Sequence, residues 1–197
     1  MRSNIRAPFI GIAGTIGAGK STLARELGQA LGLKVEPEPI SPYLRDFYQD
    51  PEAWAFQMQA YMIGARALQA QRLGRRGGIQ DRTIFEDQIF AEMLTAQGIM
   101  SRRDLATYHQ LRLALAGAPS PDVLIWLRVS PGISIERTAR RARAEEEGIP
   151  DQYLRDLCAE YERWAGATVQ RIICLEWDEP EPVESVIELL REAEVIG

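Results

Sequence analysis

Short apolar runs alternate with longer amphipathic segments along most of the chain. The run VLIWLRV, residues 123–129, is apolar at nearly every position, which is typical of a strand covered on both faces of a parallel sheet. Because turn residues bound the apolar runs and helical patterns separate them, the pattern predicts βαβ units and an α/β fold with a five-stranded parallel sheet flanked by helices. The predicted strands are 9–13, 33–35, 78–81, 123–129 and 172–175.

Residues that start and end helices divide the segments between these strands. The sequence DPE at residues 50–52 combines an N-cap acceptor, a proline at the first helical position and an acid in the first turn. The helix that follows is predicted to end before Gly74, and Ser101 with Asp104 resembles a capping box that opens another helix. The predicted helices are 21–31, 51–73, 101–117 and one that begins at 130.

Composition narrows the class of protein. A chain of 197 residues with 46% hydrophobic and 26% charged residues is expected to form one domain, spanning 1–197. The net charge of -5 argues against broad nucleic-acid binding. No apolar stretch approaches the roughly 18 residues of a membrane span, and no signal peptide is recognised, so we expect a cytoplasmic protein with no membrane partner.

The few cysteines and histidines exclude several kinds of site. Cys158 and Cys174 are isolated, which indicates neither a zinc site nor a disulfide framework, and both are predicted to be buried core residues. His109 is the only histidine and has no catalytic partner nearby in the sequence, so we interpret it as structural. A Ser-His-Asp or Cys-His mechanism is therefore not expected.

The segment GTIGAGKST, residues 14–22, follows the first predicted strand and opens the first helix. Its glycines allow the backbone to curl around phosphate oxygens, and the helix N-terminus adds partial positive charge. Lys20 is predicted to reach the β- and γ-phosphates of ATP, and the Ser21 hydroxyl to bind Mg²⁺. A chance glycine-rich turn is the alternative. The predicted ATP contacts of this loop are Gly14, Thr15, Ile16, Gly17, Ala18, Gly19, Lys20, Ser21 and Thr22.

Two further segments follow predicted strands and carry charged groups. In EPEP, prolines hold Glu36 and Glu38 apart, and one of these carboxylates could accept a proton from an attacking hydroxyl group. A solvated acidic loop explains the segment equally well. Asp81 could ligate Mg²⁺ and Arg82 could hold a phosphate, although the same dipeptide occurs in many surface ion pairs.

Two helices carry candidate binding residues. Arg137, Arg141 and Arg143 precede three glutamates and a Gly-Ile-Pro break, which suits a lid at about 137–150 that closes over phosphates. A solvated helix with Arg–Glu pairs is the competing interpretation. Gln59 and Arg66 share one helix face and could read the edge of a base, whereas by default the neighbouring apolar stripe is core and this polar pair is solvated.

Taken together and in this order, the motifs from residue 10 to about 154 resemble those of the deoxynucleoside kinases, which have a P-loop kinase fold. The resemblance implies that Glu38 is the general base on the nucleoside 5′-hydroxyl and that Tyr48, in YQDPEAW, contacts the sugar 3′-hydroxyl. It places Asp81 toward Mg²⁺ and Arg82 at the reacting oxygens, which makes Glu38, Arg82 and Lys20 the catalytic residues. It also implies a homodimer.

The resemblance extends to the base and the lid. It assigns Gln59, Arg66 and Asp87 to the base, and it assigns Glu146 to the sugar. The lid arginines Arg137, Arg141 and Arg143 become contacts of the ATP phosphates. Met58 stands where relatives often carry phenylalanine and Met62 lines the base pocket, while in WDEPEPVES, residues 177–185, no adenine contact is assigned.

These residues imply Mg²⁺- and ATP-dependent phosphorylation of a 2′-deoxynucleoside in nucleotide salvage. A carboxylate at Asp87 accepts from an exocyclic amine, and the Arg66 guanidinium can donate to a purine N7, so we rank deoxyadenosine first, then deoxyguanosine, then deoxycytidine. The alternatives are a nucleoside monophosphate kinase similar to thymidylate kinase and a nucleotide-binding subunit without catalysis. Glu38 speaks against the first, because it would face the phosphate of the acceptor.

Overall fold

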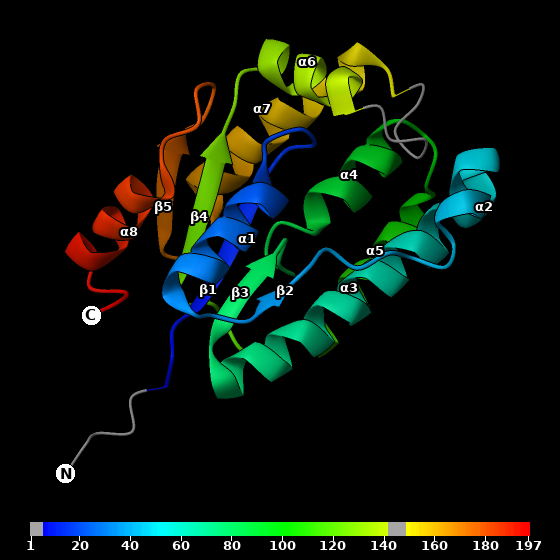
Figure 1. Ribbon diagram of the computed structural model, residues 1–197. Helices are drawn as coiled ribbons and strands as arrows, with labels where there is room; N and C mark the ends of the chain where they lie inside the picture. Colours follow the sequence, from blue (N-terminus) through cyan, green and yellow to red (C-terminus); the bar gives the residue numbers. More distant parts are fainter. Residues whose placement is uncertain (1–5, 142–148) are drawn as a thin grey trace.

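A computed structural model describes residues 6–141 and 149–197 (Figure 1). Its centre is a five-stranded sheet in the order β2-β3-β1-β4-β5, and every neighbouring pair of strands is parallel. The parallel α/β architecture predicted from the sequence is therefore confirmed. The strands are β1 (Phe9–Gly14), β2 (Val35–Glu36), β3 (Gly78–Asp81), β4 (Val123–Arg128) and β5 (Ile172–Glu176).

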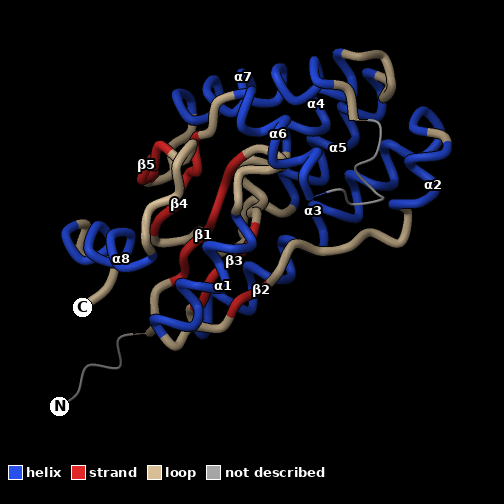
Figure 2. Tube along the Cα trace, turned by 45° about the horizontal axis from the view of Figure 1, so that its top comes forward, coloured by secondary structure: helices blue, strands red, loops and turns tan. Residues whose placement is uncertain are grey.

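Helices cover both faces of the sheet (Figure 2). One face packs against α1 and α8, and the other packs against α4 and α7. None of the described helices has both the length and the apolar character that crossing a membrane requires. The helices are α1 (Lys20–Leu31), α2 (Leu44–Gln49), α3 (Pro51–Arg76), α4 (Gln88–Ala96), α5 (Arg102–Ala114), α6 (Pro131–Arg141), α7 (Asp151–Ala167) and α8 (Val183–Glu192).

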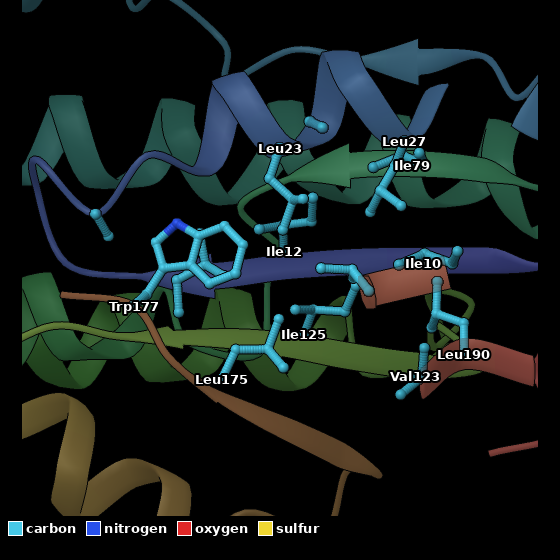
Figure 3. Close-up of a cluster of buried hydrophobic side chains, with 14 of the residues drawn as sticks. Ile10, Ile12, Leu23, Leu27, Ile79, Val123, Ile125, Leu175, Trp177 and Leu190 are labelled. Atoms are coloured by element: carbon cyan, nitrogen blue, oxygen red, sulfur yellow. The ribbon is translucent and has the colours of Figure 1, made fainter. Parts of the chain in front are cut away.

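The core explains why the strands are apolar on both sides. Figure 3 shows Leu23 and Leu27 of α1 pointing toward Ile12 and Ile79 of the sheet, with Trp177 at the end of the same cluster. These side chains are almost completely buried, and burial of each large apolar side chain contributes about 1.5–3 kcal/mol. The sheet is thereby fixed between its helices, with the carboxyl ends of all strands at one edge. Figure 1 shows α6 above this edge.

The predicted helix starts are confirmed by their caps. The Asp50 carboxylate accepts a hydrogen bond from Ala53 N at 3.2 Å, and the Ser101 hydroxyl accepts one from Asp104 N at 3.1 Å. Both contacts satisfy amides that the first helical turn leaves unpaired. The motif at residues 101–104 therefore caps α5 as expected, although α5 ends at Ala114 rather than 117.

The helix α3 ends a few residues beyond the predicted end at about Leu73. The helix continues to Arg76, and Gly77, with a φ of 76°, ends it. Gly74 serves a different purpose, because a Cβ there would lie 2.4 Å from the Pro119 Cβ. The glycine therefore allows close packing of the helix against a loop.

Three other predictions need correction. The second strand is Val35–Glu36 instead of 33–35, because these two residues are the ones that pair with β3. Cys158 is buried as expected, but Cys174 is exposed, since β5 is an edge strand. The remaining helices α2, α4, α7 and α8 were not among those predicted.

Candidate active site

The phosphate-binding loop connects β1 to α1, as its motif predicts. Gly17 has a φ of 77°, and a Cβ at this position would lie 2.7 Å from the Ser134 carbonyl oxygen. Gly19 precedes α1 with a φ of 94°, also in the left-handed region that favours glycine. The glycines thus let the backbone curl between β1 and α6 and present the first amides of α1 to an anion.

Lys20 is buried in this loop. Its ammonium donates a hydrogen bond to the Thr15 carbonyl at 2.7 Å. Burial and the nearby charge of Arg82 lower the pKa of Lys20 to about 7, although Glu38 and Asp81 oppose the shift. Because the pKa of Lys20 lies near neutral pH, a negatively charged group that binds beside it favours the protonated ammonium.

Ser21 and Asp81 meet across the first turn of α1 and the end of β3. The Ser21 hydroxyl donates to Asp81 Oδ2 at 2.5 Å. Asp81 Oδ1 is also buried, and no hydrogen-bond donor among the described residues contacts it. A hydroxyl and a carboxylate with a spare oxygen fit Mg²⁺, which prefers oxygen ligands and usually keeps waters and phosphate oxygens in its shell.

The two carboxylates of the EPEP segment have different environments. Arg72 binds both oxygens of Glu36, at 3.2 and 2.8 Å, and Lys34 binds one at 3.0 Å. These contacts lower the pKa of Glu36. They also link β2 to α3, so both oxygens of the Glu36 carboxylate already have partners. Glu38 instead lines the main cavity, and its side chain keeps 37% of its surface exposed. Only Glu38 is therefore available to a ligand.

Two arginines flank Glu38. Arg66 donates to Glu38 Oε1 at 3.0 Å, and Arg82 Nε lies 2.8 Å from the same oxygen. Burial alone would raise the pKa of Glu38, but Arg82, Arg66 and Lys20 together outweigh it and hold that pKa below its usual value. The carboxylate is therefore ionised at neutral pH and fixed between two cations.

Arg82 is held in an unusual conformation. It is a non-glycine residue with a φ of 65°, and its guanidinium lies 4.8 Å from the centre of the Phe90 ring. It also donates to the Tyr161 hydroxyl at 2.6 Å. Burial raises the pKa of Tyr161, so this hydroxyl stays protonated beside the cation. Tyr161 was not among the residues predicted from the sequence, because α7 brings it to the site from a distant segment.

Arg66, which lines the main cavity, is also part of a buried ion pair. Arg66 contacts Asp87 directly, and the Tyr108 hydroxyl donates to Asp87 Oδ2 at 2.9 Å. Gln59 is buried beside Met62 on α3. The default expectation of a solvated polar pair is therefore wrong for Gln59 and Arg66. Tyr108 was missed in the sequence, since a lone tyrosine on α5 carries no motif.

The described parts of the predicted lid are residues 137–141, at the end of α6, and residues 149–150. Arg137 donates to the carbonyl oxygens of Trp177 and Asp178, at 2.9 and 2.6 Å, and so ties α6 to the loop after β5. Arg141 lines the main cavity. Arg143 and Glu146 lie outside the described residues.

One continuous cavity has a volume of about 1600 Å³. The residues described above that line it include Lys20, Ser21, Glu38, Gln59, Arg66, Asp81, Arg82, Arg137 and Arg141. The cavity extends from the phosphate-binding loop past Glu38 to Tyr48 and Met58. A second hollow of about 750 Å³ adjoins the same loop and lies between Thr22 and Trp177. Ligand pockets usually measure about 300–1000 Å³, so the two spaces can hold a nucleotide and a separate acceptor.

The fold and this site define an enzyme class. A phosphate-binding loop with its lysine, an adjoining Ser–Asp oxygen pair and an ionised carboxylate in an acceptor cavity are the parts of a phosphoryl-transferring P-loop kinase. The chain belongs to the deoxynucleoside kinase family, whose model matches residues 10–191. Its relatives are ATP-dependent phosphotransferases, and the chain is a kinase of this family.

Individual relatives cover most of the chain. It is 37% identical to a deoxyadenosine kinase of Dictyostelium discoideum, over 96% of this chain and 80% of the relative. It is 38% identical to a deoxyadenosine/deoxycytidine kinase of Bacillus subtilis, over 79% of this chain and 76% of the relative. The solved structure of deoxyadenosine kinase from M. mycoides with bound dCTP superposes with a TM-score of 0.82, at 31% identity, and covers 95% of this chain and 99% of that one.

Proposed function

We propose that the protein transfers the γ-phosphoryl group of ATP to the 5′-hydroxyl group of a purine 2′-deoxynucleoside, with deoxyadenosine preferred over deoxyguanosine and deoxycytidine. The observation that carries this proposal is the position of Glu38. It lies in the acceptor cavity with an ionised carboxylate between Arg66 and Arg82, and Lys20 of the phosphate-binding loop is near enough to affect its pKa.

Glu38 accepts the proton of the attacking hydroxyl. Its low pKa makes it a weak base, which suits phosphoryl transfer, because the transition state is loose and the proton leaves late. The two arginines keep one carboxylate oxygen engaged and leave the other to the substrate. Positioning of the hydroxyl therefore contributes more to the rate than basicity does.

The donor occupies the phosphate-binding loop. Lys20, Arg82 and Arg141 line the main cavity beside it and neutralise the charge that spreads over the transferring group. Ser21 and Asp81 are the residues that would hold Mg²⁺. An ion held there would neutralise negative charge on the phosphate groups of the donor. The hollow between Thr22 and Trp177 is the space for the base of the donor.

Arg66, Asp87 and Gln59 read the acceptor base. Each oxygen of a carboxylate accepts two hydrogen bonds, so Asp87 still has lone pairs for an exocyclic amine beside its contacts with Arg66 and Tyr108. Relatives named deoxyadenosine kinase and deoxyadenosine/deoxycytidine kinase support an amine-bearing base. Tyr48 lines the cavity where the sugar would lie, and Glu146, outside the described residues, is proposed to join it.

We further propose that the kinase is a cytoplasmic homodimer, since nucleotide salvage uses cytoplasmic ATP. Tyr61 and Leu68 are exposed two turns apart on one face of α3, and Leu113 is exposed on α5, which packs against α3. Apolar side chains on neighbouring helices are suited to a second copy of the chain. Light scattering should give a molecular mass twice that of one chain. The double variant Leu68→Lys/Leu113→Glu should have the mass of a single chain.

An acceptor panel tests the activity. Deoxyadenosine, deoxyguanosine, deoxycytidine, thymidine and dTMP are compared with saturating Mg²⁺ and ATP in an assay coupled to ADP release. We expect kcat/KM to be highest for deoxyadenosine, lower for deoxyguanosine and lower again for deoxycytidine. A preference for dTMP would instead indicate a monophosphate kinase, and ATP binding without acceptor-dependent ADP release would indicate a non-catalytic protein.

A further inference from the structure

Gln69 and Gln80 form a buried pair of amides between α3 and β3. The Gln80 amide donates to the Arg66 carbonyl at 3.0 Å and to Gln69 Oε1 at 3.1 Å. The Gln69 amide in turn donates to the Pro37 carbonyl at 2.8 Å. Both side chains are buried. These hydrogen bonds connect β3, through α3, to the peptide bond that immediately precedes Glu38.

In this series of hydrogen bonds, each partner determines whether a glutamine side chain presents its NH₂ group or its oxygen. The Arg66 carbonyl can only accept, so Gln80 must turn its NH₂ group toward it and toward Gln69. Gln69 must then present its oxygen to Gln80, which leaves its own NH₂ group facing the Pro37 carbonyl. Gln69 is thus held as a donor to the loop and cannot turn its oxygen there without losing the contact with Gln80.

Arg72 fixes the same loop at a second point, through its two contacts with Glu36. Gln69 and Arg72 are three positions apart on α3 and therefore share a helix face. The pairing of β2 with β3 ends at Glu36, so the chain leaves the sheet just before Glu38. Two residues later the loop is solvated, since Ile40 is 80% exposed.

We propose that Gln69 is a positioning residue, which together with Arg72 holds the backbone of the Glu38 loop at the reaction centre. The inference rests on the proposed function, in which Glu38 is the general base. The contacts that Arg66 and Arg82 make with Glu38 are contacts with its side chain. The segment just before Glu38 is held by the contact of Gln69 with the Pro37 carbonyl and by the contacts of Arg72 with the Glu36 carboxylate. A displacement of about 1 Å can reduce a rate about a hundredfold.

Gln69→Glu is the variant that tests this role. It preserves the shape of the side chain and the oxygen that Gln80 contacts, but it places an oxygen against the Pro37 carbonyl in place of the donor. We expect kcat to fall about 10- to 100-fold and the KM for ATP to stay unchanged. Gln71→Glu is the matched control, because Gln71 is exposed on the same helix, and it should keep the wild-type kcat.

A double-mutant cycle separates positioning from general destabilisation. If Gln69 acts through Glu38, Gln69→Glu should cause no further loss of kcat in a Glu38→Gln background. The proposal is overturned if the losses of kcat in the two single variants multiply in the double variant. It is also overturned if Gln69→Glu alone keeps the wild-type kcat. Should Gln69→Glu fail to fold, Arg72→Met is judged by the same cycle, since Arg72 is half exposed. Full turnover by Glu38→Gln overturns the base assignment itself, whereas the other two outcomes overturn the positioning role alone.

Discussion

The hydroxyl group of Tyr161 lies 2.6 Å from the guanidinium group of Arg82, although α7 and the end of β3 are far apart in the sequence. The contact holds a cation that also pairs with Glu38 and that the proposed reaction requires at the transferring phosphoryl group. Tyr161 is buried, so little else competes for its hydroxyl.

Tyr161→Phe should therefore lower kcat about tenfold, the equivalent of about 1.4 kcal/mol in activation free energy, with a smaller change in the KM for the nucleoside. Steady-state kinetics with both substrates varied gives the two constants. Tyr61→Phe, which removes an exposed hydroxyl on α3, is the control and should leave kcat unchanged. A variant with normal kcat would show that Arg82 does not depend on this contact.

Binding of ATP should take up a proton at pH 8. The pKa of Lys20 in the ligand-free protein is lowered to about 7, so the ammonium is mostly deprotonated at pH 8, and phosphate charge raises that pKa again. Calorimetry in two buffers with different ionisation enthalpies measures the uptake. It should approach one proton at pH 8 and disappear by about pH 6, where Lys20 is already protonated.

Lys20→Arg is the control for this effect, because a guanidinium stays protonated at every pH used. Its binding enthalpy should not depend on the buffer at pH 8. If the variant takes up as many protons as the wild type, another group is responsible.

Asp81→Asn should raise the Mg²⁺ concentration needed for half-maximal activity about 10- to 100-fold, because an amide replaces the carboxylate that is proposed to hold the ion with Ser21. Titration of activity with Mg²⁺ at fixed ATP measures the shift. Asp122→Asn changes a carboxylate that binds Arg6 and Phe9 N at the other end of the sheet, and it should not alter the Mg²⁺ requirement. Equal shifts in both variants would argue against the site at Asp81.

Gly74→Ala should destabilise the protein by about 1–3 kcal/mol, since the added methyl group would overlap Pro119. Chemical denaturation gives the free energy of unfolding. Gly166→Ala on α7 is the matched change, because a Cβ there meets nothing within 4 Å, and it should be neutral or stabilise by about 0.5 kcal/mol. A Gly74→Ala variant as stable as the wild type would mean that the loop at Pro119 yields easily.

The sequence predicted those parts of the fold that local chemistry determines. Asp50 and Ser101 cap helices through contacts within three residues, and the phosphate-binding loop requires glycines at fixed spacing. The same reasoning failed at Gly74, because the reason for that glycine is a distant proline. A residue that terminates a helix and one that admits a neighbour look alike in a single sequence.

The site divides in the same way. Ser21, Glu38, Asp81 and Arg82 follow strands in recognisable motifs, so their convergence at one sheet edge could be predicted. Other contacts come from distant helices and strands: Tyr161 contacts Arg82, Tyr108 contacts Asp87, and the Gln69–Gln80 pair contacts the Pro37 carbonyl. Which buried tyrosine or glutamine contacts a functional side chain depends on tertiary packing, and no spacing in the sequence records it.

The order of the strands has a consequence for how such an enzyme can diverge. The loop after β2 and the helices α3 and α4 line the part of the main cavity proposed for the acceptor, whereas the loops after β1 and β5 line the second hollow, proposed for the base of the donor. Gly19 and Thr22 at the start of α1 line both spaces, together with Arg137 and Arg141 of α6. On the proposed function, substitutions that alter the choice of nucleoside can therefore accumulate in one half of the molecule while the affinity for ATP is preserved by the other.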